Sequence, residues 1–161
     1  MHKLFILLTL VTAIGCQSPK DKTSVTDSVS ANKTNEESPI AIGGCYMEVL
    51  KRDTFTANLQ QHGNAITGRL VFNNFEKDDS NGKVTGILEA NTLKLSYSFS
   101  SEGMNSVMEV YFKYKNGNLI RGVGEIGNKA DSVFFIDKAA VVFEGSILKK
   151  IPCESMPVKY Q

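Results

Sequence analysis

The sequence of 161 residues contains no tryptophan, four prolines and two histidines, His2 and His62. Its formal net charge is +1, so no strong field of one sign favours nucleic acid as a partner. Zinc sites need several histidines or closely spaced cysteines, and the chain has neither. We therefore expect no metal, no cofactor and no nucleic acid.

Long hydrophobic runs are also missing, since the longest one, Leu4 to Val11, is too short to span a bilayer and is interrupted by Thr9. It follows the basic residues His2 and Lys3 and precedes small residues that end at Gly15. This order of a basic, an apolar and a small-residue region is typical of a secretory signal peptide. We expect residues 1–15 to be such a signal.

Cys16 directly follows the small residues "AIG". This junction resembles the lipobox of bacterial lipoproteins, in which the cysteine is acylated, for example with palmitate, and becomes the first mature residue. The resemblance implies lipidation of Cys16 and attachment to a membrane of the cell envelope. Enterobacterial lipoproteins retained at the inner membrane carry aspartate where Gln17 stands, so the resemblance favours the outer membrane, with the protein facing the periplasm or the cell surface. A plain signal peptide with an incidental cysteine is the alternative.

Residues 17–42 are dominated by Ser, Thr, Asn, Lys, Asp and Glu and contain no aromatic residue. Such a segment cannot bury enough apolar surface to offset the entropy of ordering it. We expect a disordered tether, so that residues 16–42 form a lipid-anchored linker and residues 43–161 the folded domain.

Two cysteines remain once Cys16 is assigned to the lipid, namely Cys45 and Cys153. Exported proteins meet an oxidising compartment, which favours a disulfide between them. The pair would tie the beginning of the folded domain to its end. Two buried free thiols are the alternative.

From Gly43 onward apolar and polar residues alternate, as in "TLKLSYSFSS" at residues 92–101. This alternation predicts strands with one buried face, and turn-forming clusters separate about 8–10 of them. The fold class is therefore all-β: a single antiparallel meander barrel or barrel-like sandwich. The candidate interior residues are Leu93, Leu95, Tyr97 and Phe99 from one strand and Met108, Val110 and Phe112 from the next.

Glycines at positions 68, 86, 122 and 124 fall inside expected strands, where they mark bends of a small barrel. "ITGRL" and "VTGIL" are near copies that suit successive strands of one hairpin. Such "TG" strands after a "GCY" opening resemble calycin barrels, the lipocalin and avidin group. The resemblance implies the architecture and a small, largely apolar ligand. Avidins hold biotin with tryptophans, and this chain has none, so no binding residue is transferred.

The connection "SSEGMNS" joins the two most strongly patterned strands and combines hydroxyls, a carboxylate and a methionine. Functional residues are often found on loops held by a rigid scaffold, so Ser101, Glu102, Met104, Asn105 and Ser106 are a candidate loop site. A plain hairpin connection is the alternative. Lysozyme inhibitors of Gram-negative envelopes are also small lipid-anchored barrels with a disulfide, which suggests protein binding as a second function.

No enzymatic activity is expected from the sequence. Nucleophilic hydrolysis requires a base beside the nucleophile and a third group that orients the base. Nothing in the sequence places a serine and a carboxylate beside His62. The sequence therefore favours a non-catalytic binding module.

Overall fold

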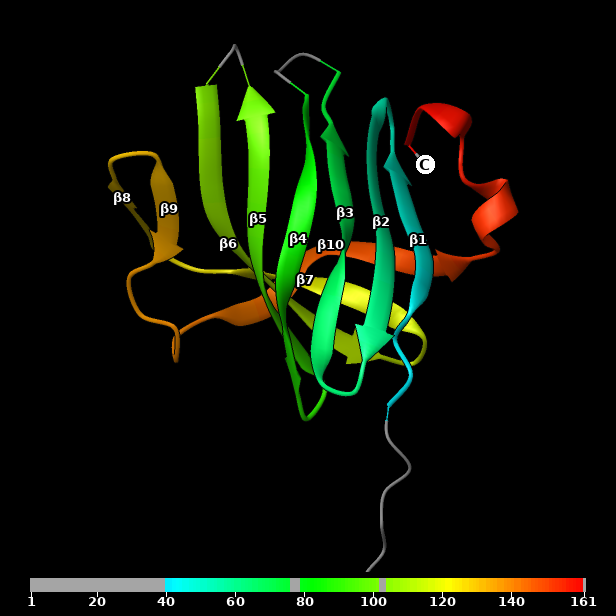
Figure 1. Cartoon of the computed structure of the whole chain (residues 1–161), viewed down its shortest axis with the longest axis horizontal. Helices are drawn as coiled ribbons and strands as arrows, with labels where there is room; N and C mark the ends of the chain where they lie inside the picture. Colours follow the sequence, from blue (N-terminus) through cyan, green and yellow to red (C-terminus); the bar gives the residue numbers. More distant parts are fainter. Residues whose placement is uncertain (1–39, 76–78, 102–103, 161) are drawn as a thin grey trace, which may run out of the picture. The chain divides into compact units, whose positions relative to one another are not determined.

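The computed structural model describes residues 40–75, 79–101 and 104–160, and these residues form ten strands and two short 3-10 helices (Figure 1). The strands are β1 (Gly44–Leu50), β2 (Asp53–His62), β3 (Ala65–Asn73), β4 (Ser80–Glu89), β5 (Thr92–Ser101), β6 (Met104–Lys115), β7 (Asn118–Val123), β8 (Ile126–Lys129), β9 (Ser132–Phe135) and β10 (Val142–Ile151). The helices are η1 (Cys153–Ser155) and η2 (Val158–Tyr160). Within the described ranges, no helix has the length and apolar character needed to cross a membrane.

Eight of these strands close into an antiparallel barrel in the order β5-β4-β3-β2-β1-β10-β7-β6, with β5 and β6 paired to complete the ring. Strands β1 to β7 follow one another as a meander, and β10 returns to fill the place between β7 and β1. The hairpin β8–β9 lies outside the ring and joins β6 through a short parallel pairing. The all-β meander barrel predicted from the sequence is confirmed.

The barrel interior is filled by one cluster of buried apolar side chains. Residues of alternating positions contribute to it, because successive side chains of a strand point to opposite faces. Phe55, Phe72, Tyr97 and Phe99 form a row of ring contacts with centroid separations of 4.8–5.7 Å. This row fixes β2, β3 and β5 against one another through the interior.

Glycines let neighbouring strands approach closely on the inner face. A Cβ added at Gly68, Gly82 or Gly86 would lie 2.0–2.1 Å from a backbone oxygen of the adjoining strand. Gly68 and Gly86 lie inside strands, as the sequence predicted, and the structure shows a close strand approach there where the sequence predicted bends. The near-copy segments that contain them are the paired strands β3 and β4. The prediction that Gly124 lies inside a strand is wrong, because this residue follows the end of β7.

Two residues ahead of β1, Ile40 and Ile42, already pack into the barrel core. Ile42 is fully buried in the core, and Ile40 packs against it. The side chain of Gln61 accepts a hydrogen bond from the Ile42 amide at 2.8 Å and donates one to the Ile40 carbonyl at 2.9 Å. The signal peptide, Cys16 and the rest of the expected linker lie outside the described residues.

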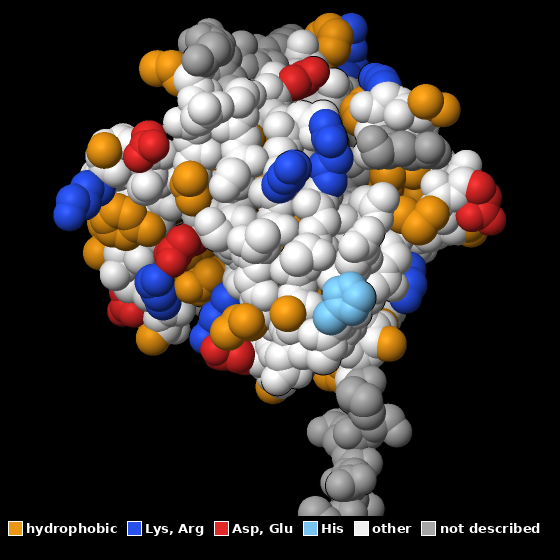
Figure 2. Space-filling model, in the orientation of Figure 1, with side chains coloured by type: hydrophobic (Ala, Val, Ile, Leu, Met, Phe, Trp, Pro, Cys, Tyr) orange, Lys and Arg blue, Asp and Glu red, His pale blue; other side chains and the backbone are white. Residues whose placement is uncertain are grey.

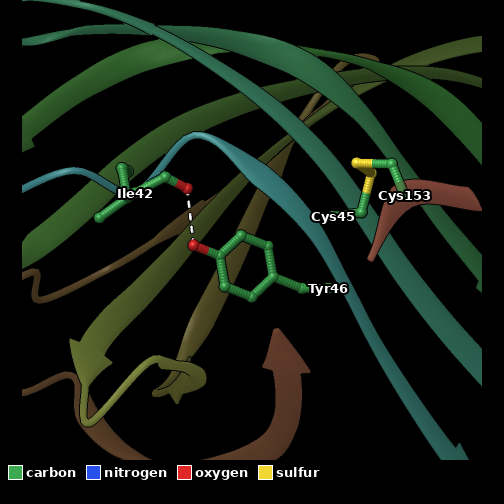
Figure 3. The surroundings of a disulfide bond; sticks show 4 residues. All are labelled: Ile42, Cys45, Tyr46 and Cys153. Carbon is green, nitrogen blue, oxygen red and sulfur yellow. Dashed lines mark hydrogen bonds between the residues drawn. A yellow bond between two sulfur atoms is a disulfide. The ribbon is translucent and has the colours of Figure 1, made fainter. Parts of the chain in front are cut away.

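A disulfide joins Cys45 on β1 to Cys153 in η1, as the sequence predicted (Figure 3). Figure 3 shows that Tyr46, the next residue, points to the other side of β1, where its hydroxyl donates a 2.6 Å hydrogen bond to the Ile42 carbonyl. Burial raises the pKa of Tyr46 to about 12. The disulfide thus fastens the C-terminal segment to the outside of the barrel, where Met156 and Tyr160 pack against Cys45 and Val71.

Candidate functional site

The ladder between β6 and β7 covers only the last third of β6. Its last pair is Phe112 with Arg121, after which β6 pairs with β9 at Val107 and Met108 while β7 pairs with β10. The two neighbouring strands therefore separate toward one end of the barrel. A pocket of about 250 Å³ lies at this separation, between β6, β7, β10 and the β8–β9 hairpin.

A bulge in β10 shapes the opposite wall of the pocket. Between Phe143 and Ile147 the strand advances four residues while β7 advances two, so residues 144–146 stand opposite Arg121 alone. Gly145 sits in this bulge, where an added Cβ would lie 2.9 Å from the Arg121 carbonyl oxygen and 3.1 Å from its Cβ. The missing side chain lets β10 fold tightly over Arg121.

The pocket wall is mainly apolar. Met108 and Val110 come from β6, Val123 from β7, and Ile126 and Phe135 from the outer hairpin. Ile126 is 57% exposed, which places it at the rim, whereas Phe135 is buried and packs on Tyr111 with ring centroids 5.0 Å apart. Such a wall accommodates a small ligand with an apolar surface.

Arg121 is the charged residue that distinguishes this pocket. Its guanidinium carbon lies 4.6 Å from the centre of the Phe72 ring, across the barrel interior on β3. Ion pairs within the described parts of the chain join Glu89 to Lys94 and Glu109 to Lys138, and none involves Arg121. Burial lowers the pKa of Arg121, with the nearby Tyr97 hydroxyl opposing this shift.

Glu109 holds the outer hairpin against the barrel. One of its carboxylate oxygens accepts a 3.1 Å hydrogen bond from the Phe135 amide, and the other accepts a 2.5 Å bond from Lys138. The hydrogen bond between Lys138 and Glu109, together with the negative charge of Glu109, raises the pKa of Lys138. The hairpin that carries Ile126 and Phe135 is thus fixed beside the pocket by a carboxylate whose two oxygens are both engaged.

The structure places all seven predicted interior residues in the barrel core or against it. Leu93, Leu95, Tyr97, Val110 and Phe112 are at most 2% exposed, so these five side chains are packed in the interior. Phe99 and Met108 are only partly buried. Of the seven, only Met108 and Val110 also line the pocket at the β6–β7 separation.

The sequence reasoning missed Arg121 and Gly145 of the β10 bulge, although it singled out Gly122 and Gly124 as strand glycines. A signal was present: in "NLIRGVG", alternation from the buried Leu119 puts Arg121 on the inward face of its strand. A charged residue at an inward position between apolar neighbours indicates a polar group that needs a partner.

The predicted projecting loop at residues 100–106 is wrong in its extent. Ser101 belongs to β5 and Met104, Asn105 and Ser106 belong to β6, with Ser101 opposite Met104 in the ladder. The alternating strands continue through the hydroxyl-rich residues, so only positions 102 and 103 connect them. Glu102 lies outside the described residues.

Asn105 and Ser106 instead line a shallow groove of about 520 Å³ on the outer face of the barrel, together with Arg69, Lys83, Ser98 and Asp131. Arg69 donates a 2.6 Å hydrogen bond to the Asn81 side chain, and Ser100 donates one of 2.5 Å to Asn105. Figure 2 shows Lys and Arg side chains gathered over the upper parts of β3 and β4, with uncharged polar groups and backbone around them. The groove is thus lined mainly by polar residues, in contrast to the apolar pocket at the β6–β7 separation.

The closed antiparallel barrel is compatible with the calycin-like architecture that the sequence resembles. No protein family model, curated protein or solved structure matches the chain.

Proposed function

We propose that this protein is a lipid-anchored component of the bacterial cell envelope whose barrel domain is a non-catalytic binding module for a small, largely apolar ligand. The anchoring part rests on the pattern "AIG" followed by Cys16. The binding part rests on one observation, the apolar pocket where β6 and β7 separate. Its volume of about 250 Å³ lies just below the range of ligand sites, which begins at about 300 Å³, and so limits the ligand to a small molecule.

The pocket, rather than the centre of the barrel, is the proposed binding place. Eight-stranded barrels are just wide enough to be filled by their own side chains, and the fully buried Leu93, Tyr97 and Phe112 fill this one. The strand separation supplies what the centre does not, namely an apolar surface that solvent can reach.

Binding can be tested with N-phenyl-1-naphthylamine, a neutral apolar dye that fluoresces strongly when it leaves water. We expect the chain without residues 1–15 and with Cys16→Ala, which keeps every described residue, to bind this dye. Ser146→Phe should weaken binding at least about tenfold, because a ring placed on the β10 bulge occupies the pocket. Ser98→Phe, the same change on the other face, should leave the affinity within about twofold. Equal affinities of the two variants would contradict the proposed site.

The anchor is tested separately with the full chain. Cys16→Ala should abolish incorporation of a radioactive fatty acid and release the protein from the membrane fraction, because the thiol is the acyl acceptor that the lipobox resemblance implies. Undiminished labelling of the variant would refute lipidation at this residue. Fractionation of the labelled envelope then reports whether the outer membrane holds the protein.

Protein recognition, for example an inhibitor role like that of envelope lysozyme inhibitors, is the second candidate function. It is favoured by the polar groove with Asn105 and Ser106 and by Met104, which is 67% exposed beside it on β6. An exposed methionine next to hydrogen-bonding groups is a composition often found at protein contacts.

A further inference from the structure

We infer that the ligand of the pocket at the β6–β7 separation is a small organic anion, with an acidic group that pairs with Arg121 and an apolar body that lies against Met108, Val110 and Phe135. This inference rests on the proposed function and specifies its ligand class. It is argued from the charges around the pocket and from the cost of the arrangement that the structure shows.

The position of Arg121 is unfavourable without a partner. A half-buried guanidinium loses part of its hydration, and a buried charge without a partner is unfavourable. The Phe72 ring compensates part of this cost, since an aromatic face attracts a cation at such a distance. No ion pair within the described parts of the chain involves Arg121, and a guanidinium can bind an acidic group in a bidentate manner.

The other charges around the pocket leave this role open. Glu109 is the acidic residue on the pocket wall, and its two oxygens already accept hydrogen bonds from Lys138 and the Phe135 amide. The charges of Glu109 and Lys138 compensate one another, so Arg121 carries the uncompensated charge among the residues that line the described pocket. An anion that enters the pocket therefore meets a cation that is in no ion pair with the described residues.

The wall restricts the rest of the ligand. Beyond Arg121, the pocket is lined by aliphatic and aromatic side chains and by glycines of β7 and the β10 bulge. The ligand class that fits both parts has one acidic group on a compact apolar body. A neutral apolar molecule would fill the wall but leave the Arg121 cation unpaired.

Competition between a carboxylate and an alcohol of equal chain length tests the inference. With the dye bound to the chain lacking residues 1–15 and carrying Cys16→Ala, octanoate should displace it at a concentration at least about tenfold lower than octanol. The factor corresponds to one hydrogen-bonded charge pair. Octanol is the more apolar of the two, so a pocket that recognised only apolar surface would prefer it.

Two arginine variants test whether Arg121 causes the preference for octanoate over octanol. Arg121→Gln should remove the preference, so that octanoate and octanol displace the dye at concentrations within about threefold of one another. Arg69→Gln makes the same change of charge on the outer groove and should keep the preference. Arg121→Gln would overturn the inference if it retained the full preference for octanoate.

The comparison of octanoate with octanol on the chain that keeps Arg121 tests the inference even if Arg121→Gln does not fold. Equal displacement by octanoate and octanol, or stronger displacement by octanol, overturns the anionic ligand and leaves the proposed function standing. Failure of the dye to bind at all overturns the proposed function and the inference with it.

Discussion

Loss of the Cys45–Cys153 disulfide is expected to lower the free energy of unfolding by about 4–5 kcal/mol. The two cysteines are separated by 108 residues, and a loop of about 100 residues closed by a disulfide corresponds to about 4.7 kcal/mol of denatured-state entropy. Domains of this size are stable by only about 5–15 kcal/mol, so the loss removes a large fraction of the total. The bond also holds the segment from Cys153 to Tyr160 on the outer face of β1 and β3.

Urea denaturation of the double variant Cys45→Ala/Cys153→Ala, followed by far-ultraviolet circular dichroism, measures this loss. The matched control is Cys16→Ala, which removes a cysteine outside the described barrel and should leave the midpoint unchanged. The wild-type protein should show the same loss when a reductant is added. A difference below about 1 kcal/mol between oxidised and reduced protein would show that the loop closure does not stabilise the fold as argued.

Replacement of Gly86 by alanine is expected to cost about 3 kcal/mol or more. The added Cβ would lie 2.1 Å from the Lys94 carbonyl oxygen and 2.9 Å from the Leu95 Cα, both on the neighbouring strand β5. Gly86 pairs with Leu95 in the ladder, so β4 and β5 must separate to admit a methyl group. Such a shift would disturb hydrogen bonds and the packing of the fully enclosed core at once.

Gly43→Ala is the control for this prediction, because a Cβ there meets no atom closer than 3.6 Å. Its stability should change by less than about 1 kcal/mol, with any gain coming from reduced freedom of the unfolded chain. Thermal unfolding monitored by circular dichroism compares both variants with the parent chain. If Gly86→Ala unfolded at the same temperature as Gly43→Ala, the close approach of β4 and β5 would not be a constraint of the fold.

The features that the sequence predicted well depend on local patterns. Alternation of apolar residues placed Leu93 to Phe99 on one face of β5, because a strand turns every second side chain inward. The near-copy segments "ITGRL" and "VTGIL" indicated paired strands, and the two cysteines outside the lipobox indicated the disulfide. Each of these signals is contained in a few neighbouring residues or in a simple count.

The pocket could not be predicted in the same way, because it depends on where pairing ends. The ladder of β6 and β7 stops at Phe112 and Arg121, and β9 takes up part of the free edge of β6 in parallel orientation. Neither event has a signature in the separate strands, since each depends on which segments from elsewhere in the sequence lie beside β6 and β7. Arg121 could be assigned to the inward face, but the opening beside it could not.

The connection between β5 and β6 was misjudged for a different reason. Glycine, asparagine and serine favour turns, and their density at residues 100–106 suggested a long loop. In the structure the ladder continues to Ser101 and Met104, because antiparallel pairing offers backbone hydrogen bonds to alternate residues of both strands. Cross-strand pairing overrides local turn preference when both strands are long.

Closure of the barrel also determines how copies of this protein can meet. Open sheet edges are templates for aggregation between molecules, and a closed ring removes them. Among the described strands, only β8 lacks a neighbour along its whole outer side, and it is four residues long and ends in Lys129. Short edges with a lysine discourage strand addition. Copies crowded side by side can therefore remain separate without a dedicated covering element.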